Sequence, residues 1–386
     1  KRQGLKFKIL EGLNIDLKYQ TEGTYDKNRT LYSNMSYKVR NMINDAAQYD
    51  AATGSLTLNV PKGGQLDESR YESYSYTMRA QVNFNRILGK HAISALGGAE
   101  RRLVRRTGAQ NYYMGYDDNS LGVKPINPLV MSPINGTEAL LGSFNWVYGE
   151  YNALTHTEDR YVSFYANGSY TFDERYLLTA TVRGDGATNF AKGNKWGVFP
   201  SVSGAWRISE ENFWKNSKLM NVVNSLKLRV GYGVTGNNAI GSSKYTTNYS
   251  QTTYPMGNNE NNSAYVVGTT LGNKDLKWET LHATNIGLDI SLFNSRVNLT
   301  AEWYNNQISD LLMNCVIPSS TGYSSQYQNV GEMRNRGWEI TLNTVNINTK
   351  NFRWTTDLNL AFNSSKVLAL EGVEAVSYTH LTLPTT

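Results

Sequence analysis

The feature that most constrains this chain is a regular alternation of apolar and polar side chains in four consecutive segments between residues 161 and 235. The clearest of them reads Leu178, Thr179, Ala180, Thr181, Val182, Arg183. Successive side chains of a β-strand point to opposite faces, so each segment predicts a strand with one apolar and one polar face. A soluble sandwich turns the apolar face inward, whereas a membrane barrel turns it toward lipid and lines its lumen with the polar face.

At 386 residues the chain is long enough for one large barrel or for two ordinary domains. Strand-like patterns recur along its whole length, and weaker candidates lie at residues 31–42, 56–60 and 144–154. The stronger predicted strands cover residues 5–19, 71–86, 91–104, 161–172, 176–184, 196–208, 226–235, 284–292, 297–305, 336–346 and 352–363.

Connection lengths separate the two architectures. Short turns are predicted at residues 88–90, 173–175, 294–295 and 348–351, and long polar connections at 105–142, 236–283 and 307–335. From residue 161 onward short and long connections alternate, as expected if all short turns lie at one end of the strands. Only the connection at 209–225 is longer than the other connections at that end. The fold class predicted is therefore an all-β, transmembrane, antiparallel up-and-down barrel of about 11 to 14 strands, with short periplasmic turns and long outer loops. A soluble sandwich or adhesin, with Greek-key crossovers, is the alternative.

Composition agrees with this prediction. The mean hydropathy is −0.49, and no run of about 18 apolar residues suggests a membrane-spanning helix. The 26 Tyr and 8 Trp suit water–lipid interfaces, where we expect Trp196, Trp206, Trp278, Trp303, Trp338 and Trp354 to lie. The single Cys315 excludes an internal disulfide framework, and the net charge of +6 is modest for this length.

Eight ordered blocks between residues 173 and 337 resemble the SusC/RagA family of TonB-linked outer-membrane proteins. They read DERYLLTATVR from Asp173, KWGVFPSVS from Lys195, WRISEE from Trp206, LKLRVGYGVTGN from Leu226, LKWET from Leu276, NIGLD from Asn285, SDLL from Ser309 and NVGEMRNRG from Asn329. The stretch before residue 160 is compatible with the family but more variable.

The resemblance implies a 22-stranded barrel in the outer membrane of a Bacteroidota-like bacterium, plugged by an N-terminal domain. Such barrels import oligosaccharides or peptides, driven by the TonB–ExbB–ExbD complex, under a SusD-like lipoprotein lid. We expect residues 1–375 to form part of that barrel, with the plug, the N-terminal modules and the last strands missing, and residues 376–386 to be a non-native tail. The implied function is transport, without a cofactor.

Aromatic residues in the long connections are the candidate ligand contacts, because apolar faces of sugar rings stack on aromatic rings. They are Tyr112, Tyr113, Tyr116, Trp146, Tyr148, Tyr254 and Tyr323. The simpler interpretation is that these side chains pack on one another or on the lid.

The run containing Arg101, Arg102, Arg105 and Arg106 is predicted at the outer rim, where guanidinium groups could contact lipopolysaccharide phosphates or the lid. A solvated strand end is the alternative, and a nucleic-acid partner is not expected.

The other motifs give little information about function. The glycines from Gly231 to Gly236 fit a dinucleotide-binding spacing but no helix is predicted after them, so we expect them to relieve crowding on a curved strand. The paired acids at 158–159 and 210–211 are interpreted as solvated charges. The four histidines show no metal-ligand spacing, so no metal and no enzymatic activity are predicted. An outer-membrane hydrolase remains the enzymatic alternative and would have to use His156.

Overall fold

The structure is a computed structural model that describes residues 1–50, 52–125, 153–241, 243–256, 260–268 and 270–370. The chain divides into two compact units. Unit 1 comprises Lys1, Gln20–Tyr76 and Leu103–Glu158, and unit 2 comprises Arg2–Tyr19, Thr77–Arg102 and Asp159–Thr386. Strands β2, β5, β6 and β7 contribute residues to both units. Among the described residues, none of the helices is long and apolar enough to cross a membrane.

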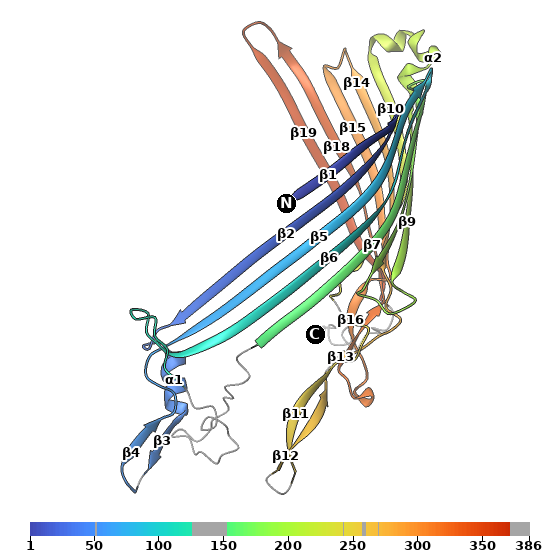
Figure 1. Cartoon of the computed structure of the whole chain (residues 1–386). Helices are drawn as coiled ribbons and strands as arrows, with labels where there is room; N and C mark the ends of the chain where they lie inside the picture. Colours follow the sequence, from blue (N-terminus) through green and yellow to red (C-terminus); the bar gives the residue numbers. More distant parts are fainter. Residues whose placement is uncertain (51, 126–152, 242, 257–259, 269, 371–386) are drawn as a thin grey trace, which may run out of the picture. The chain divides into compact units, whose positions relative to one another are not determined.

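Twelve long strands form one sheet in the order β1-β2-β5-β6-β7-β8-β9-β10-β14-β15-β18-β19, so each strand lies beside the long strand that precedes it in the chain (Figure 1). Their bounds are β1 Arg2–Leu10, β2 Leu13–Tyr32, β5 Gly64–Leu88, β6 His91–Tyr116, β7 Ala153–Phe172, β8 Tyr176–Ala187, β9 Trp196–Arg207, β10 Val223–Asn237, β14 Glu279–Leu292, β15 Val297–Ser309, β18 Glu332–Asn348 and β19 Arg353–Ala369. The pairs from β7 to β19 are antiparallel. This is the predicted up-and-down order, and the strand count falls within the predicted range.

The short turns predicted from sequence are confirmed at all four positions. Between β7 and β8, Asp173 and Glu174 have φ of 50° and 56°, the left-handed geometry of tight hairpin turns. Three residues with positive φ, Phe293, Asn294 and Ser295, reverse the chain between β14 and β15. The bulky return between β9 and β10 contains three short helices, which are η3 (Ile208–Glu210), α2 (Asn212–Lys215) and η4 (Lys218–Asn221).

The alternation in unit 2 is inside out relative to a soluble protein. On β8, Leu178 and Val182 are 52% and 45% exposed, whereas the polar Thr179 and Thr181 between them are half-buried. On β9, Val198 and Val202 are likewise exposed, and Ser201 is half-buried. Exposed apolar side chains on a regular sheet face are what contact with lipid requires.

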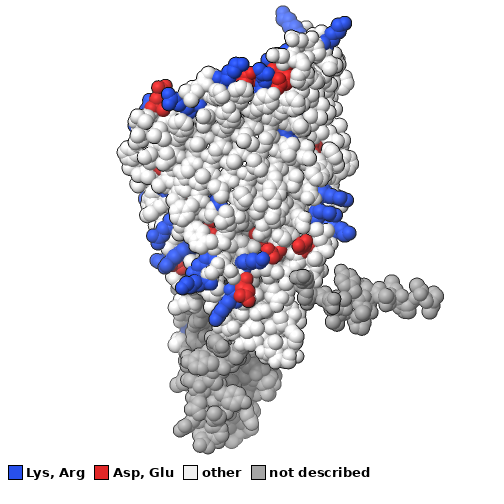
Figure 2. Space-filling model, turned by 90° about the vertical axis from the view of Figure 1, so that its right-hand side faces the viewer, with Lys and Arg blue, Asp and Glu red and all other residues white. Residues whose placement is uncertain are grey.

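Two rows of aromatic rings bound the apolar face of β7, β8 and β9. Near the short turns, Tyr176 is paired with Trp206 and their ring centroids lie 6.5 Å apart. Ten residues along β9, Trp196 stacks on Phe164 at 6.0 Å. At about 3.3 Å per residue and a tilt of about 45°, ten residues rise about 23 Å, close to the apolar band of about 25 Å in outer-membrane barrels. Figure 2 shows Lys, Arg, Asp and Glu gathered at two levels, with a broad stretch between them that is nearly free of charge.

Several local predictions are wrong. Residues 5–19 form two strands rather than one, because Gly12, with φ of 81°, turns the chain between β1 and β2. The strand predicted to end at residue 104 continues to Tyr116, so the start of the predicted loop 105–142 is strand. The connection 236–283 is not all loop, since it contains the hairpin of β11 (Tyr249–Met256) and β12 (Glu260–Val267) and the short β13 (Thr270–Leu271).

In unit 1 the weak strand candidate at 31–42 is wrong over its second half, which is helix. The helix α1 (Tyr37–Asp45) begins after Ser36, whose Oγ accepts a hydrogen bond from the backbone N–H of Val39 at 3.3 Å. Its apolar face packs in a small core of Val39, Ile43, Ala46 and Val60. A two-stranded ribbon of β3 (Ala47–Asp50) and β4 (Ser55–Leu58) follows, where a strand at 56–60 was predicted.

Candidate functional site: lumen wall and outer loops

The polar face of unit 2 carries a network of paired charges. The Arg229 guanidinium on β10 donates to Asp289 on β14 at 2.9 Å and to Glu302 on β15 at 3.2 Å. Asn285 donates to the same Glu302, and Thr300 donates to Asp289 at 3.2 Å. Each carboxylate has a cationic or amide partner, so this part of the wall is hydrophilic and its charged groups are hydrogen-bonded, with one guanidinium between two carboxylates.

The same face continues across β5 to β9. Arg183 donates to Asp185 at 2.8 Å and to the Ser163 hydroxyl at 2.9 Å. Neighbouring cross-strand bonds join hydroxyl and amide groups, namely Asn167 to Thr181 at 2.7 Å, Ser169 with Thr179 at 3.0 Å, and Tyr165 to Gln81 at 3.0 Å. Side-chain ladders of this kind stabilise the sheet and present hydrogen-bonding groups to the lumen.

Three connections at the ends of the strands opposite the short turns share one apolar cluster, here called the loop cluster. Phe190 from the β8–β9 connection, and Ile240 and Leu276 from the β10–β14 connection, are buried in it. Trp278, Leu312 and Tyr327 pack against these residues, and the Trp278 ring lies 5.6 Å from Phe190 and 5.5 Å from Phe199. Long loops normally contain few buried apolar side chains, so this cluster gives these loops a core of their own.

Hydrogen bonds reinforce the loop cluster. Asn329 and Lys277 exchange two bonds of 2.9 Å between their amide, carbonyl and N–H groups. Asn273 donates to the Tyr327 carbonyl at 2.8 Å, and the Trp278 indole donates to the Lys195 carbonyl at 3.0 Å. The β13, β16 (Leu312–Val316) and β17 (Ser325–Asn329) strands form a three-stranded sheet that joins the β10–β14 and β15–β18 connections.

In unit 1, the buried Glu68 carboxylate on β5 is ion-paired with three cations, two on β2 and one on β5 itself. Lys27, Arg29 and Arg70 approach it at 3.1, 3.4 and 2.5 Å. Burial raises the pKa of Glu68, but hydrogen bonds from Lys27 and Arg70 outweigh it and hold the pKa below its ordinary value. The Arg29 guanidinium also donates to the Tyr116 hydroxyl at 3.3 Å, which in turn donates to Asp118 at 3.2 Å.

The predicted ligand contacts lie in different parts of the chain. Tyr112, Tyr113 and Tyr116 are on strand β6 in unit 1 rather than in a loop; the first two are half-buried and Tyr116 is 4% exposed. Tyr323 follows η5 (Ser319–Thr321) and is half-buried in unit 2. Tyr254 is part of β11, and Trp146 and Tyr148 lie outside the described residues.

The four arginines lie in the middle of β6 and not at its end, because the strand continues past them. Arg101 and Arg102 belong to unit 2, and Arg105 and Arg106 to unit 1. Arg105 is ion-paired with Glu158 at 2.8 Å.

Sequence reasoning missed several features, among them the burial of Asp159, which the sequence predicts to be a solvated charge but which is 8% exposed. Glu211 is not a solvated charge: it is 8% exposed and accepts hydrogen bonds from Tyr176, from Trp206 at 3.1 Å and from Arg175 at 2.9 Å. These donors, led by Tyr176 and Trp206, hold its pKa below the ordinary value. Trp278 does not belong to an interfacial row, because it packs in the loop cluster. Only the spacing of apolar residues within otherwise polar connections signalled that cluster.

Metal-ligating side chains do not cluster in the part of the chain that the structure describes. Within those residues no group of three or more His, Cys, Asp or Glu side chains is placed to share a metal ion. The Cys315 thiol is buried, and this burial raises its pKa, the opposite of what an activated nucleophile needs.

Comparison with known proteins identifies the family to which this architecture corresponds. Residues 5–384 match the family described as TonB dependent receptor-like, beta-barrel. The TonB-dependent receptor P26 of Formosa agariphila is 33% identical over 323 residues, which are 83% of this chain and 30% of that receptor. The TonB-dependent receptor SusC of Bacteroides thetaiotaomicron is 35% identical over 58% of this chain and 22% of SusC.

Solved structures agree in fold. The RagAB peptide importer in its open-open state superimposes with a TM-score of 0.76 at 22% sequence identity, over 96% of this chain and 36% of that chain. The chain therefore spans about a third or less of the length of the relatives that it matches. Inside-out strands, a polar lumen wall and these matches together show that the chain belongs to the TonB-dependent receptor β-barrel family, as a SusC/RagA-type protein of the outer membrane.

Proposed function

We propose that the protein containing this chain imports oligosaccharides across the outer membrane, with TonB supplying the energy and a SusD-like lipoprotein closing its outer face. The observation that carries the proposal is the wall chemistry of unit 2. Its polar face combines hydroxyl and amide ladders with ion-paired charges. A lumen of this kind suits an uncharged solute that is rich in hydrogen-bonding groups.

Half-buried tyrosines on the outer parts of the chain support the same ligand class. Tyr112 and Tyr113 on β6 and Tyr323 after η5 combine an aromatic face with a hydroxyl, as sugar recognition requires. We propose these three as ligand contacts. Tyr116, whose ring is covered and whose hydroxyl is bonded to Arg29 and Asp118, is proposed to position Tyr112 and Tyr113 on the same strand.

A lipoprotein partner is supported by the resemblance to SusC-type receptors and by the RagAB structures, in which a receptor of this fold is part of a peptide importer. The loop cluster would give such a partner a stable surface to meet, since three connections are held by one core. Peptides are the second ligand class to test.

The test uses the full-length receptor in its native outer membrane and two fluorescently labelled probe sets, a ladder of neutral oligosaccharides and a protease digest of casein. We expect uptake of at least one neutral oligosaccharide, its loss when the tonB gene is deleted, and weaker binding after Tyr113→Ala. Uptake of peptides alone would refute the oligosaccharide assignment. Uptake that persists without TonB would refute the energised mechanism.

A further inference from the structure

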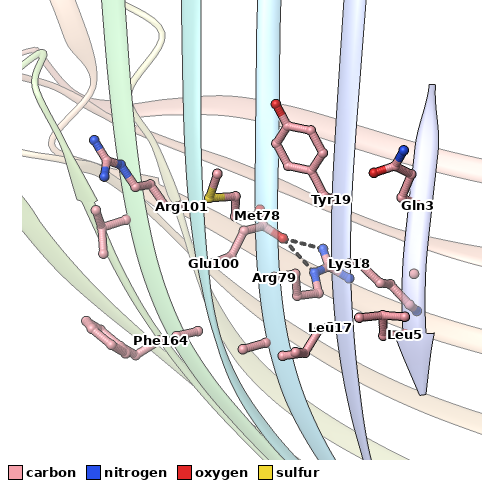
Figure 3. A pocket seen from close by; sticks show the side chains of 14 residues that line it. Gln3, Leu5, Leu17, Lys18, Tyr19, Met78, Arg79, Glu100, Arg101 and Phe164 are labelled. Carbon is pink, nitrogen blue, oxygen red and sulfur yellow. Dashed lines mark hydrogen bonds and ion pairs between the residues drawn. The ribbon is translucent and has the colours of Figure 1, made fainter. Parts of the chain in front are cut away.

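One hollow in unit 2 lies on the sheet face that carries the exposed apolar side chains. It is a groove of about 700 Å³ across β1, β2, β5, β6 and β7. Its apolar lining includes Leu5, Leu17, Met78, Val162 and Phe164, and small residues at Ala80 and Ala99 form its floor. Figure 3 shows Leu5, Leu17 and Phe164 at one end, and Arg101, Tyr19 and Gln3 at the other.

The side chain of Arg101 points to this face and not to the lumen. Glu100 accepts from Arg79 at 2.7 Å, and Arg79 lies over the ring of Tyr165, whose hydroxyl donates to Gln81 on the polar face. Since successive strand residues alternate, Ala99 and Arg101 must face the opposite way, toward lipid, while Glu100 and Arg102 face the lumen. An exposed arginine therefore stands beside an apolar groove on a lipid-facing surface.

The height of Arg101 places it at a membrane boundary. It follows the short turn before His91 by ten residues, which at about 3.3 Å per residue and about 45° of tilt correspond to about 23 Å. Short turns of such barrels lie in the periplasm, and the apolar band is about 25 Å tall. Arg101, with Tyr19 and Gln3 at the same end of the groove, is then at the level of the outer-leaflet headgroups (Figure 3).

From these features we infer that the groove is a binding site for lipid A, the membrane anchor of lipopolysaccharide. One acyl chain lies along Leu17, Met78 and Phe164, and a phosphate group is held by the Arg101 guanidinium. Charge complementarity selects this occupant, since a guanidinium pairs with phosphate through two parallel hydrogen bonds and lipid A presents its phosphates at that level. The site is independent of the imported ligand, because it lies on the other face of the wall.

The experiment measures lipid A by native mass spectrometry on the full-length receptor extracted from outer membranes. We expect Arg101→Gln to lower the lipid A retained per receptor by about tenfold, the loss of one charge-assisted contact, and Arg101→Lys to retain most of it. Ala99→Phe should lower it as well by filling the groove floor. The matched control is Arg102→Gln, one residue along the same strand on the lumen face, which should retain lipid A like the unmodified receptor.

Heat-modifiable migration verifies that each variant is folded. Equal loss from Arg101→Gln and Arg102→Gln would overturn the inference, because it would reflect a general effect of positive charge. Unchanged retention in both Arg101→Gln and Ala99→Phe would overturn it too. A final arm reconstitutes the receptor with phosphatidylethanolamine alone or with added lipid A; equal retention of the two lipids would show an unselective groove and also refute the assignment.

Discussion

The orientation of the sheet faces can be tested by placing one charge on either side of a single strand. Val202 on β9 is 49% exposed, and it lies four residues from Trp206 and six from Trp196. Four residues correspond to about 9 Å of height, so Val202 is near the middle of a band about 25 Å tall. Ser203 follows it directly and points to the polar face.

We expect Val202→Arg to lower the free energy of unfolding by about 2 to 4 kcal/mol, the cost of an arginine at the bilayer midplane on the lipid face of a barrel. Ser203→Arg should cost about 1 kcal/mol or less. Its side chain enters a hollow lined by Thr179, Arg229 and Gly231, where Asp289 and Glu302 lie close to Arg229.

The assay is a urea titration of the full-length receptor folded into lipid vesicles, followed by tryptophan fluorescence and by heat-modifiable migration. The ratio of the two effects is decisive, because both substitutions add the same side chain to the same strand. If Ser203→Arg costs as much as Val202→Arg, or if Val202→Arg is neutral, the apolar face does not contact lipid and the assigned orientation of the sheet is wrong.

Three further perturbations test other parts of unit 2. Leu276→Ala should destabilise the loop cluster by about 2 to 5 kcal/mol, because Leu276 is fully buried there. We expect faster amide hydrogen exchange around Tyr327 while exchange in the long strands stays the same, and unchanged exchange around Tyr327 would contradict the prediction. Gly337→Ala should cost about 1 to 3 kcal/mol in urea titrations, since its Cβ would overlap the Phe362 carbonyl oxygen. Gly168→Ala, with no atom within 4 Å of the added Cβ, should be near neutral, and equal effects would refute the packing argument. Glu211→Gln should lower the melting temperature at pH 7. Because the folded pKa of Glu211 is depressed, its stabilisation is present above the unfolded pKa and is lost as the pH falls through the folded pKa; a difference from the unmodified receptor that does not shrink on acidification would contradict the ionised-carboxylate role.

The wall of unit 2 was predictable from sequence because its information is local. The alternation around Leu178 and Val182 depends only on neighbours in the chain, and so do the hairpin residues Asp173 and Asn294. The family blocks fall on the same strands. Even so, the alternation alone does not distinguish lipid from a protein core as the surroundings of the apolar face. The regular alternation of short and long connections was needed to choose between them.

The outer parts were predicted poorly because their structure depends on distant partners. Composition marked residues 105–116 as loop, yet β6 continues to Tyr116, with Tyr116 and Arg29 bonded across 87 residues of sequence. Trp278 resembled the other strand-end tryptophans, but its ring packs on Phe190 from a different connection. Glu211 became a hydrogen-bond centre because Tyr176 and Trp206 lie on adjacent strands. No pattern within one segment predicts such contacts between residues that are far apart in the sequence.

This difference between wall and loops has a functional consequence. The wall needs only apolar residues toward lipid and hydrogen-bonded polar groups toward the lumen. Many sequences satisfy this requirement, so receptors for different ligands can keep the same wall. The connections are long and polar, yet Phe190, Ile240 and Leu276 fix their bases in one buried cluster. Sequence changes beyond that cluster, as in the β11–β12 hairpin, can then alter the surface offered to a ligand while the bases of the loops stay in place. We therefore expect related receptors with different ligands to differ most between β11 and β12, and least at the cluster positions.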